Sequence, residues 1–157
     1  MAITLRRFAA ADAAAVASLI VRTLRISNAK DYPPEEIEAL ARRHTPEYML
    51  ERASWTHLYV ACDGDTIVGC GAIGPYWGRE DESCLFSIFV DPDRQGRGVG
   101  RRVVEALEAD EFFLRARRVE VPASVTACDF YRKLGYDYKN GVTSPDDEGL
   151  IRLEKRQ

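Results

Sequence analysis

The stretch from residue 83 to residue 102 constrains the fold of this chain more than any other. Residues 83–90 (SCLFSIFV) are almost continuously apolar, which is typical of a central strand covered on both faces. A proline turn follows at Asp91-Pro92, and residues 95–101 (QGRGVGR) then lead into an apolar pattern with helical spacing. This order predicts helices packed on a sheet, with a glycine loop at the end of a buried strand.

The glycine loop has the chemistry of an anion site. Its three glycines, Gly96, Gly98 and Gly100, alternate with larger residues, so the backbone can turn tightly with its N–H groups facing one concavity. The N-terminus of the following helix adds further N–H donors, and Arg97 and Arg101 add positive charge. We therefore expect a phosphate ligand here, and a pyrophosphate fits best.

Other phosphate-binding loops fit this segment less well. A P-loop needs Lys and then Ser or Thr after its last glycine, whereas Arg101 and Arg102 stand at those positions. A dinucleotide-binding loop reads Gly-x-Gly-x-x-Gly, whereas this one reads Gly-x-Gly-x-Gly, and most of the chain precedes it. Glu120 does follow at about twenty residues, which keeps the dinucleotide reading as a minor alternative.

The remaining pattern predicts a mixed sheet with helices packed on it. We expect strands over residues 3–8, 57–62, 66–73, 83–90, 119–121, 136–138 and 150–153. We expect helices from about residue 13 to 27, from Pro33-Pro34, from Thr45, over 99–117 and from Ser124 to Leu134.

Composition limits the class of protein. The 157 residues fit one domain, residues 1–157, and 46% hydrophobic with 30% charged residues is ordinary for a globular protein. A net charge of -3 disfavours a nucleic-acid partner. No run approaches the roughly 18 apolar residues of a membrane span, and the arginines at positions 6 and 7 interrupt any signal-peptide pattern.

The cysteines predict a reducing compartment. Cys62, Cys70, Cys84 and Cys128 show no Cys-x-x-Cys spacing, and each stands in an apolar pattern. We interpret them as buried free thiols of a cytoplasmic protein. Neither of the two histidines, at positions 44 and 57, has ligand spacing to them, so we expect no metal site and a structural role for both histidines.

Two motifs together resemble the GNAT superfamily of N-acetyltransferases. The first is Gln-x-x-Gly-x-Gly, with Gln95, Gly98 and Gly100, and the second is residues 130–136 (FYRKLGY). The resemblance implies a mixed α/β fold with a mostly antiparallel, twisted sheet flanked by helices, in which the central strands splay apart. Residues 28–36 and 121–124 resemble a bacterial YafP-type branch of the superfamily.

The resemblance also implies a binding site for acetyl-coenzyme A (acetyl-CoA). The pantetheine arm would pair with the backbone of the central strand, and the pyrophosphate would lie on the glycine loop. Many relatives have an asparagine near the start of the helix that carries Tyr131, and its side chain bonds the pantetheine arm. This chain has Ser124 there instead, which either replaces the asparagine or only caps the helix. The residues implied to contact the cofactor are Ile88, Phe89, Val90, Gln95, Gly96, Arg97, Gly98, Val99, Gly100, Arg101 and Ser124.

The implied reaction is direct attack of a primary amine on the thioester. Tyr131 matches the family's general acid, which protonates the leaving thiolate; an ordinary core aromatic is the alternative. Glu82 is the candidate general base, with Asp81 second and a solvated loop acid as the alternative. A free backbone N–H near Phe89 or Val90 would stabilise the oxyanion.

The implied acceptor is a small-molecule amine or a protein or peptide amine. Tyr32, Tyr76 and Trp77 are candidate pocket residues, and ordinary packing is the alternative for all three. No membrane partner is expected, and a homodimer fits the family. The competing function is a catalytically silent coenzyme-A-binding sensor or partner module.

Overall fold

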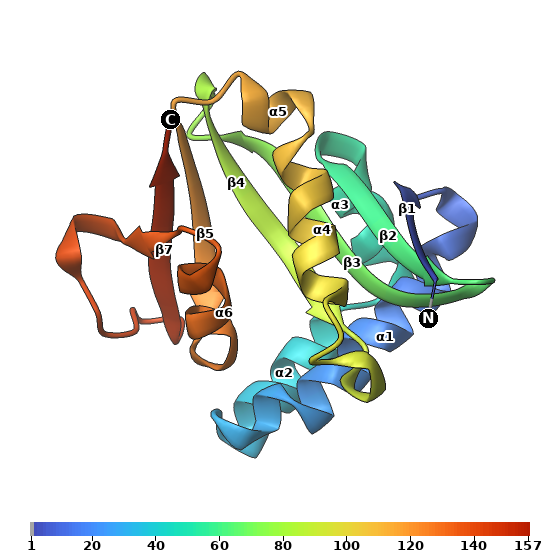
Figure 1. Cartoon of the computed structure of the whole chain (residues 1–157). Coiled ribbons are helices and arrows are strands. Elements are labelled where there is room, and N and C mark those ends of the chain that lie inside the picture. The colour runs from blue at the N-terminus through green and yellow to red at the C-terminus, as the bar shows by residue number, and fades with distance from the viewer. Residues whose placement is uncertain (1) are drawn as a thin grey trace.

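A seven-stranded sheet forms the centre of the molecule (Figure 1), and the computed structural model describes residues 2–157. The strands lie in the order β1-β2-β3-β4-β5-β7-β6, and β4 with β5 is the parallel pair among antiparallel ones. This confirms the predicted mixed, mostly antiparallel sheet. The strands are β1 (Ile3–Arg7), β2 (His57–Asp63), β3 (Thr66–Tyr76), β4 (Arg79–Val90), β5 (Arg118–Ser124), β6 (Asp137–Tyr138) and β7 (Leu150–Arg156).

Helices cover both faces of the sheet. One apolar core joins β2 and β3 to α1 (Ala13–Ile26), α2 (Pro34–Arg43) and α3 (Pro46–Trp55). A second core lies on the other face, beneath α4 (Val99–Glu108), α5 (Glu111–Leu114) and α6 (Cys128–Lys133). Within residues 2–157, no helix is both long and apolar enough to cross a membrane.

Several predicted boundaries differ from the structure: β3, β5 and β7 are longer than expected, and α6 begins at Cys128 rather than Ser124, because Ser124 caps a separate 3-10 turn. Two further differences also have local reasons. The helix expected over residues 99–117 ends at Glu108, because Asp110 begins α5 by accepting a hydrogen bond from the Phe112 N–H at 2.8 Å. Strand β4 begins at Arg79 rather than Ser83, since the turn at Trp77 and Gly78 brings the chain straight back onto β3.

Strand β4 contains a β-bulge near its centre. Cys70 faces Phe89 and Ala72 faces Phe86, so Ser87 and Ile88 together oppose the single residue Gly71. Ser87 has φ 53°, a left-handed conformation in which a non-glycine residue is strained. The bulge leaves one β4 residue outside the regular ladder with β3.

Beyond the bulge, β4 loses its other neighbour as well. Strands β4 and β5 pair only over residues 82–84 and 118–120, and then diverge (Figure 1). We call residues 85–90 of β4 and 121–124 of β5 the β4–β5 split. Pro122 lies within it, where β5 has become an edge strand, a position at which proline is tolerated. The split confirms the predicted splaying of the central strands.

Candidate active site

The glycine loop presents a continuous row of free backbone donors. From Gln95 to Arg101, no backbone N–H donates a hydrogen bond to any group in the described residues 2–157, and the first bonded one is Arg102, to the Gly98 carbonyl at 3.1 Å. Gly96 and Gly98 have φ 78° and 82°, and the space beside each α-carbon is open. Seven adjacent N–H groups at a helix N-terminus form a strong site for an anion.

The side chains around the loop hold it in place. The Gln95 amide nitrogen donates to the Ser27 hydroxyl at 3.0 Å and to the Val90 carbonyl at 3.1 Å, which ties the loop to α1 and to the end of β4. Asp91 accepts hydrogen bonds from Arg22 at 2.6 Å and from the Asp93 N–H at 2.9 Å. Burial raises the pKa of Asp91, but these hydrogen bonds outweigh it and lower the pKa below its usual value.

The predicted pantetheine strand lies beside the loop. Ile88, Phe89 and Val90 are half-buried and belong to the part of β4 that has no β5 partner. A Cβ on Gly100 would lie 3.1 Å from the Phe130 ring, so this glycine allows α4 and α6 to approach closely at the end of the β4–β5 split. Ser124 uses its hydroxyl to accept the Ala127 N–H at 3.1 Å and so begins a short turn before α6.

Tyr131 enters the β4–β5 split from α6. Its side chain is 4% exposed, and its hydroxyl makes no hydrogen bond within residues 2–157. Burial raises the pKa of Tyr131 well above its usual value, and the nearby thiols of Cys70 and Cys84 add to the shift. Since those thiols belong to β3 and β4, the phenol is directed at the centre of the sheet. It stays protonated at neutral pH, as a general acid must.

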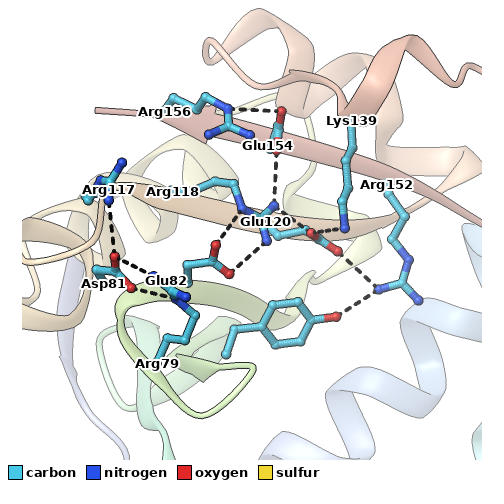
Figure 2. A network of polar contacts seen from close by, with 11 residues as sticks. Arg79, Asp81, Glu82, Arg117, Arg118, Glu120, Lys139, Arg152, Glu154 and Arg156 are labelled. Carbon is cyan, nitrogen blue, oxygen red and sulfur yellow. Dashed lines mark hydrogen bonds and ion pairs between the residues drawn. The ribbon is translucent and has the colours of Figure 1, made fainter.

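Glu82 occupies a different environment from the loop that the sequence suggested. It lies inside β4 at the paired end, and its carboxylate accepts a hydrogen bond from Arg118 at 3.2 Å (Figure 2). Asp81 is bound by Arg79 at 2.9 Å. From Glu82 to Ile88 the strand spans roughly 20 Å at about 3.3 Å per residue, so Glu82 lies at the far end of β4 from residues 88–90.

Three further side chains lie on the opposite face of the sheet from Tyr131, and one of them, His44, was expected to have only a structural role. Tyr48 and Arg52 lie one turn apart on α3, so they share one side of the helix, and His44 lies directly before the N-cap Thr45. The His44 ring lies 5.0 Å from Tyr48 and 6.1 Å from Phe89 on β4, and its Nδ1 lies 2.8 Å from the Leu40 carbonyl. In the sequence, only the four-residue spacing of Tyr48 and Arg52 indicated that two of these side chains lie together.

Burial lowers the pKa of His44 below the ordinary 6.5. The neutral imidazole therefore predominates at pH 7. The Leu40 carbonyl can only accept, so Nδ1 carries the proton and Nε2 keeps its lone pair. Nε2 has no hydrogen-bond partner in the described part of the chain, and it is free to accept a proton.

The predicted acceptor-pocket residues have three different environments. The Tyr32 hydroxyl donates to the Gly149 carbonyl at 2.6 Å and accepts from the Val125 N–H at 2.8 Å, so it joins the segment before α2 to the far side of the β4–β5 split. The Tyr76 ring lies 6.3 Å from Phe86 on the same face as Arg52. Trp77 is 64% exposed at the hairpin turn.

Comparison with known sequences gives one family. Residues 21–136 match the model of the acetyltransferase (GNAT) family. An uncharacterized N-acetyltransferase of Methanocaldococcus jannaschii is 36% identical over 103 residues, which cover 62% of this chain. The matched part spans 39% of the length of that relative.

Solved structures of acetyltransferases share the fold. The PaiA N-acetyltransferase of Thermoplasma acidophilum, in complex with coenzyme A, superposes with a TM-score of 0.84 at 16% identity over the full length of both chains. A GCN5-related N-acetyltransferase of Rhodopseudomonas palustris gives 0.79 at 26% identity, covering 100% of this chain and 99% of its own. A GNAT acetyltransferase of Brucella melitensis, in complex with acetyl-CoA, gives 0.67 at 18% identity, covering 99% and 88%. The YafP-type branch and a homodimer stay predictions.

Proposed function

Because the chain belongs to the GNAT acetyltransferase family, we propose that it transfers an acetyl group from acetyl-CoA to a primary amine. The observation that carries this proposal is the row of seven free N–H groups from Gln95 to Arg101, directly after an unpaired strand edge. A pyrophosphate can accept hydrogen bonds from the loop N–H groups, and an amide-containing arm can pair with the unpaired edge of β4. Two of the superposed relatives were solved with coenzyme A or acetyl-CoA bound.

In this proposal the cofactor lies along the β4–β5 split. Its pyrophosphate accepts from the loop N–H groups, with Arg97 and Arg101 nearby, and its pantetheine arm pairs with residues 88–90. The thioester then lies near the bulge, within reach of Tyr131 from the α6 face. Ser124 closes the opposite side, where its hydroxyl already serves the turn before α6.

The reaction forms one bond and breaks one. The neutral amine attacks the thioester carbonyl, and a backbone N–H near Phe89 or Val90 stabilises the oxyanion. As the intermediate collapses, the C–N bond stays, the C–S bond breaks, and Tyr131 gives its proton to the departing thiolate. The attacking nitrogen loses one proton, and the products are an amide and free coenzyme A.

For the group that removes this proton we assign His44 rather than Glu82. His44 is neutral at pH 7, has an unshared Nε2 lone pair, and lies on the face of β4 opposite Tyr131. In this arrangement the general acid Tyr131 acts from one face of the sheet and the general base His44 from the other, with the thioester and the amine between them. Glu82 is bound by Arg118 and would need a long chain of waters.

A thermal-shift panel with acetyl-CoA, NAD and ATP tests the ligand class, and an amine screen with free-thiol detection tests turnover. At about one hundred times its dissociation constant, acetyl-CoA should add roughly 2.7 kcal/mol of stability. Stabilisation by NAD alone would favour the dinucleotide reading. Stabilisation by acetyl-CoA without turnover on any amine would favour the silent sensor module. The four buried free thiols support action in a reducing compartment such as the cytoplasm.

A further inference from the structure

Arg52 has an unusual environment for a partly buried arginine. Its one polar partner is the Tyr48 hydroxyl, at 2.7 Å from Nη2, and its Nε is buried without any hydrogen-bond partner. No carboxylate in residues 2–157 lies within 4.0 Å of its guanidinium. Aromatic rings surround it instead, with Phe86 at 4.6 Å and Trp55 at 5.4 Å.

The other arginines that are buried or half-buried all have acidic partners. Arg22 and Arg94 pair with Asp91, at 2.6 and 3.3 Å. Arg118 pairs with three carboxylates, and Arg152 is 3.0 Å from Asp146. A half-buried cation without a counter-ion is costly, and a buried nitrogen without a partner adds to that cost. The exception at Arg52 therefore points to a partner from outside the chain.

The position of Arg52 connects this missing partner to the proposed reaction. Phe86, beneath the guanidinium, is the residue directly before the bulge at Ser87 and Ile88, where we place the thioester. Arg52 lies on the face of β4 that carries His44, and Tyr131 reaches the sheet from the other face. With the thioester at the bulge, an amine bound on this face of β4 would lie near Arg52.

We propose that the acceptor carries a carboxylate close to its amine and that Arg52 binds this carboxylate; the proposal rests on the acetyl-transfer function above. A guanidinium offers parallel N–H donors that match a carboxylate, and both would then be satisfied. Phe86, which lies under Arg52, directly precedes the bulge, so the carboxylate and the amine of the acceptor must be close together. This favours an amino acid or a compound of that size. A polyamine is disfavoured because a second cation would face Arg52.

The test is an acceptor series that differs only at the carboxyl group. L-amino acids, their amides, the corresponding decarboxylated amines and O-phosphoethanolamine are compared by release of free coenzyme A thiol. We expect kcat/KM to be about 10- to 100-fold higher for the acids than for the amides, as a charged hydrogen-bonding pair implies. Preference for the phosphate compound over every acid would overturn the choice of carboxylate.

Variants separate ligand binding from packing. Arg52→Met keeps an unbranched chain against the aromatic rings but removes the donors. We expect it to lose the preference for acids by the same 10- to 100-fold and to use amides within about twofold of the wild type. Arg115→Met is the control, since Arg115, directly after α5, lies 4.6 Å from the Phe112 ring centroid and has no acidic partner within residues 2–157. It should change neither series.

Equal losses with acids and amides in Arg52→Met would mean that Arg52 only packs, and the proposal would fail. If that variant does not fold, Arg52→Lys keeps the charge without the fork and should still weaken the preference for acids. Acetylation of polyamines but of no carboxylate-bearing amine would refute this inference and leave acetyl transfer standing. Absence of any acetyl-CoA binding would instead refute the proposed function itself.

Discussion

The two ends of β4 differ in how completely their polar groups are satisfied. At the paired end, residues 82–84 bond to β5, and the charged side chains form a closed cluster (Figure 2). At the unpaired end, residues 88–90 have no β5 partner, and the loop after them holds seven free N–H groups. Both ends belong to one continuous strand, so this difference follows from what surrounds each end.

The paired end is dominated by one buried carboxylate. Glu120 is 1% exposed and lies 2.7 Å from Arg118, 2.9 Å from Lys139 and 3.5 Å from Arg152. Arg118 is shared in turn with Glu82 and with an acid of β7. We call the group Glu82, Arg118, Glu120, Lys139, Arg152 and Glu154 the ionic cluster. Because the acidic and basic side chains of this cluster pair with one another, it does not need a ligand to balance its charges.

The unpaired end shows the opposite condition. The loop N–H groups, the Tyr131 hydroxyl, the His44 Nε2 and the Arg52 guanidinium all lack a full set of partners within residues 2–157. Among these groups the Arg52 Nε is buried, and a buried polar atom without a partner is rare in folded proteins. We therefore expect ligands to bind at the unpaired end of β4 and the ionic cluster to have a structural role.

The largest effect should come from opening the ionic cluster. Glu120→Gln leaves Arg118, Lys139 and Arg152 without their shared partner, and removal of one member of a buried ion network costs about 3–5 kcal/mol. We expect that loss in the free energy of unfolding from urea titration at pH 7. Glu38→Gln is the control, because Glu38 forms an exposed pair with Arg25 and should lose less than about 1 kcal/mol.

The same pair of proteins should show a defined pH dependence. Burial raises the pKa of Glu120, but Lys139 and Arg118 outweigh it, and the net pKa lies below the ordinary 4.5. A lowered carboxyl pKa stabilises the fold above the ordinary value, and this contribution is lost as the pH falls through the lowered one. The difference between wild type and Glu120→Gln should therefore shrink below pH 4.5. A constant difference down to pH 3 would contradict the ionic account.

The next largest effect should come from closing the anion site. Gly98→Glu places bulk and a negative charge where the pyrophosphate must lie, and we expect affinity for acetyl-CoA to fall by more than about 100-fold. Isothermal titration calorimetry measures this directly. Gly64→Glu is a matched control, since Gly64 has φ 61° and equally open space but lies in the β2–β3 turn. Equal affinity in the two variants would show that the loop is only a turn.

Tyr131 and Tyr136 provide the third comparison. Both are buried, yet Tyr136 donates to Glu108 at 2.8 Å, whereas the Tyr131 hydroxyl has no partner within residues 2–157. Tyr131→Phe should keep its stability and its affinity for acetyl-CoA but lose about 100-fold in kcat. Tyr136→Phe should lose about 1 kcal/mol of stability and keep kcat.

The pH profile of kcat distinguishes the two roles of Tyr131. Loss of a general acid matters less at high pH, where a free thiolate is a tolerable leaving group, so the defect of Tyr131→Phe should shrink above about pH 8.5. Near-normal turnover at every pH would show that Tyr131 is only a core aromatic.

The sequence predicted the elements that depend on local pattern. The apolar run 83–90, the glycine loop and the FYRKLGY motif all fold as expected, because each is determined by residues close together in the chain. The strands predicted over residues 57–62 and 66–73 are confirmed for the same reason, and they pair with each other. The split between β4 and β5 followed only from the family resemblance.

The sequence could not predict partners that depend on distant pairing. Glu82 was expected to be free in a loop, but its environment is set by Arg118, thirty-six residues away. Asp110 was placed within a helix, although it bonds to His57 and Tyr59 on β2. Arg52 carries no motif, and its lack of an acidic neighbour is visible only when the whole chain is folded.

The smallest effects concern the group that removes a proton from the amine, and they distinguish His44 from Glu82 in this role. We expect His44→Gln to lower kcat about tenfold at pH 7, less than a general base usually contributes, because part of the amine is neutral without help. Since burial places the His44 pKa below 6.5, wild-type kcat should hold above that pH and fall below it as the imidazole becomes protonated. This acidic limb should disappear in His44→Gln.

Glu82→Gln should weaken the bond to Arg118, lower stability by about 1 kcal/mol, and leave kcat within twofold with the limb intact. The reverse pattern, with the limb abolished by Glu82→Gln and kept in His44→Gln, would return the base to the paired end and break the division between the two ends of β4.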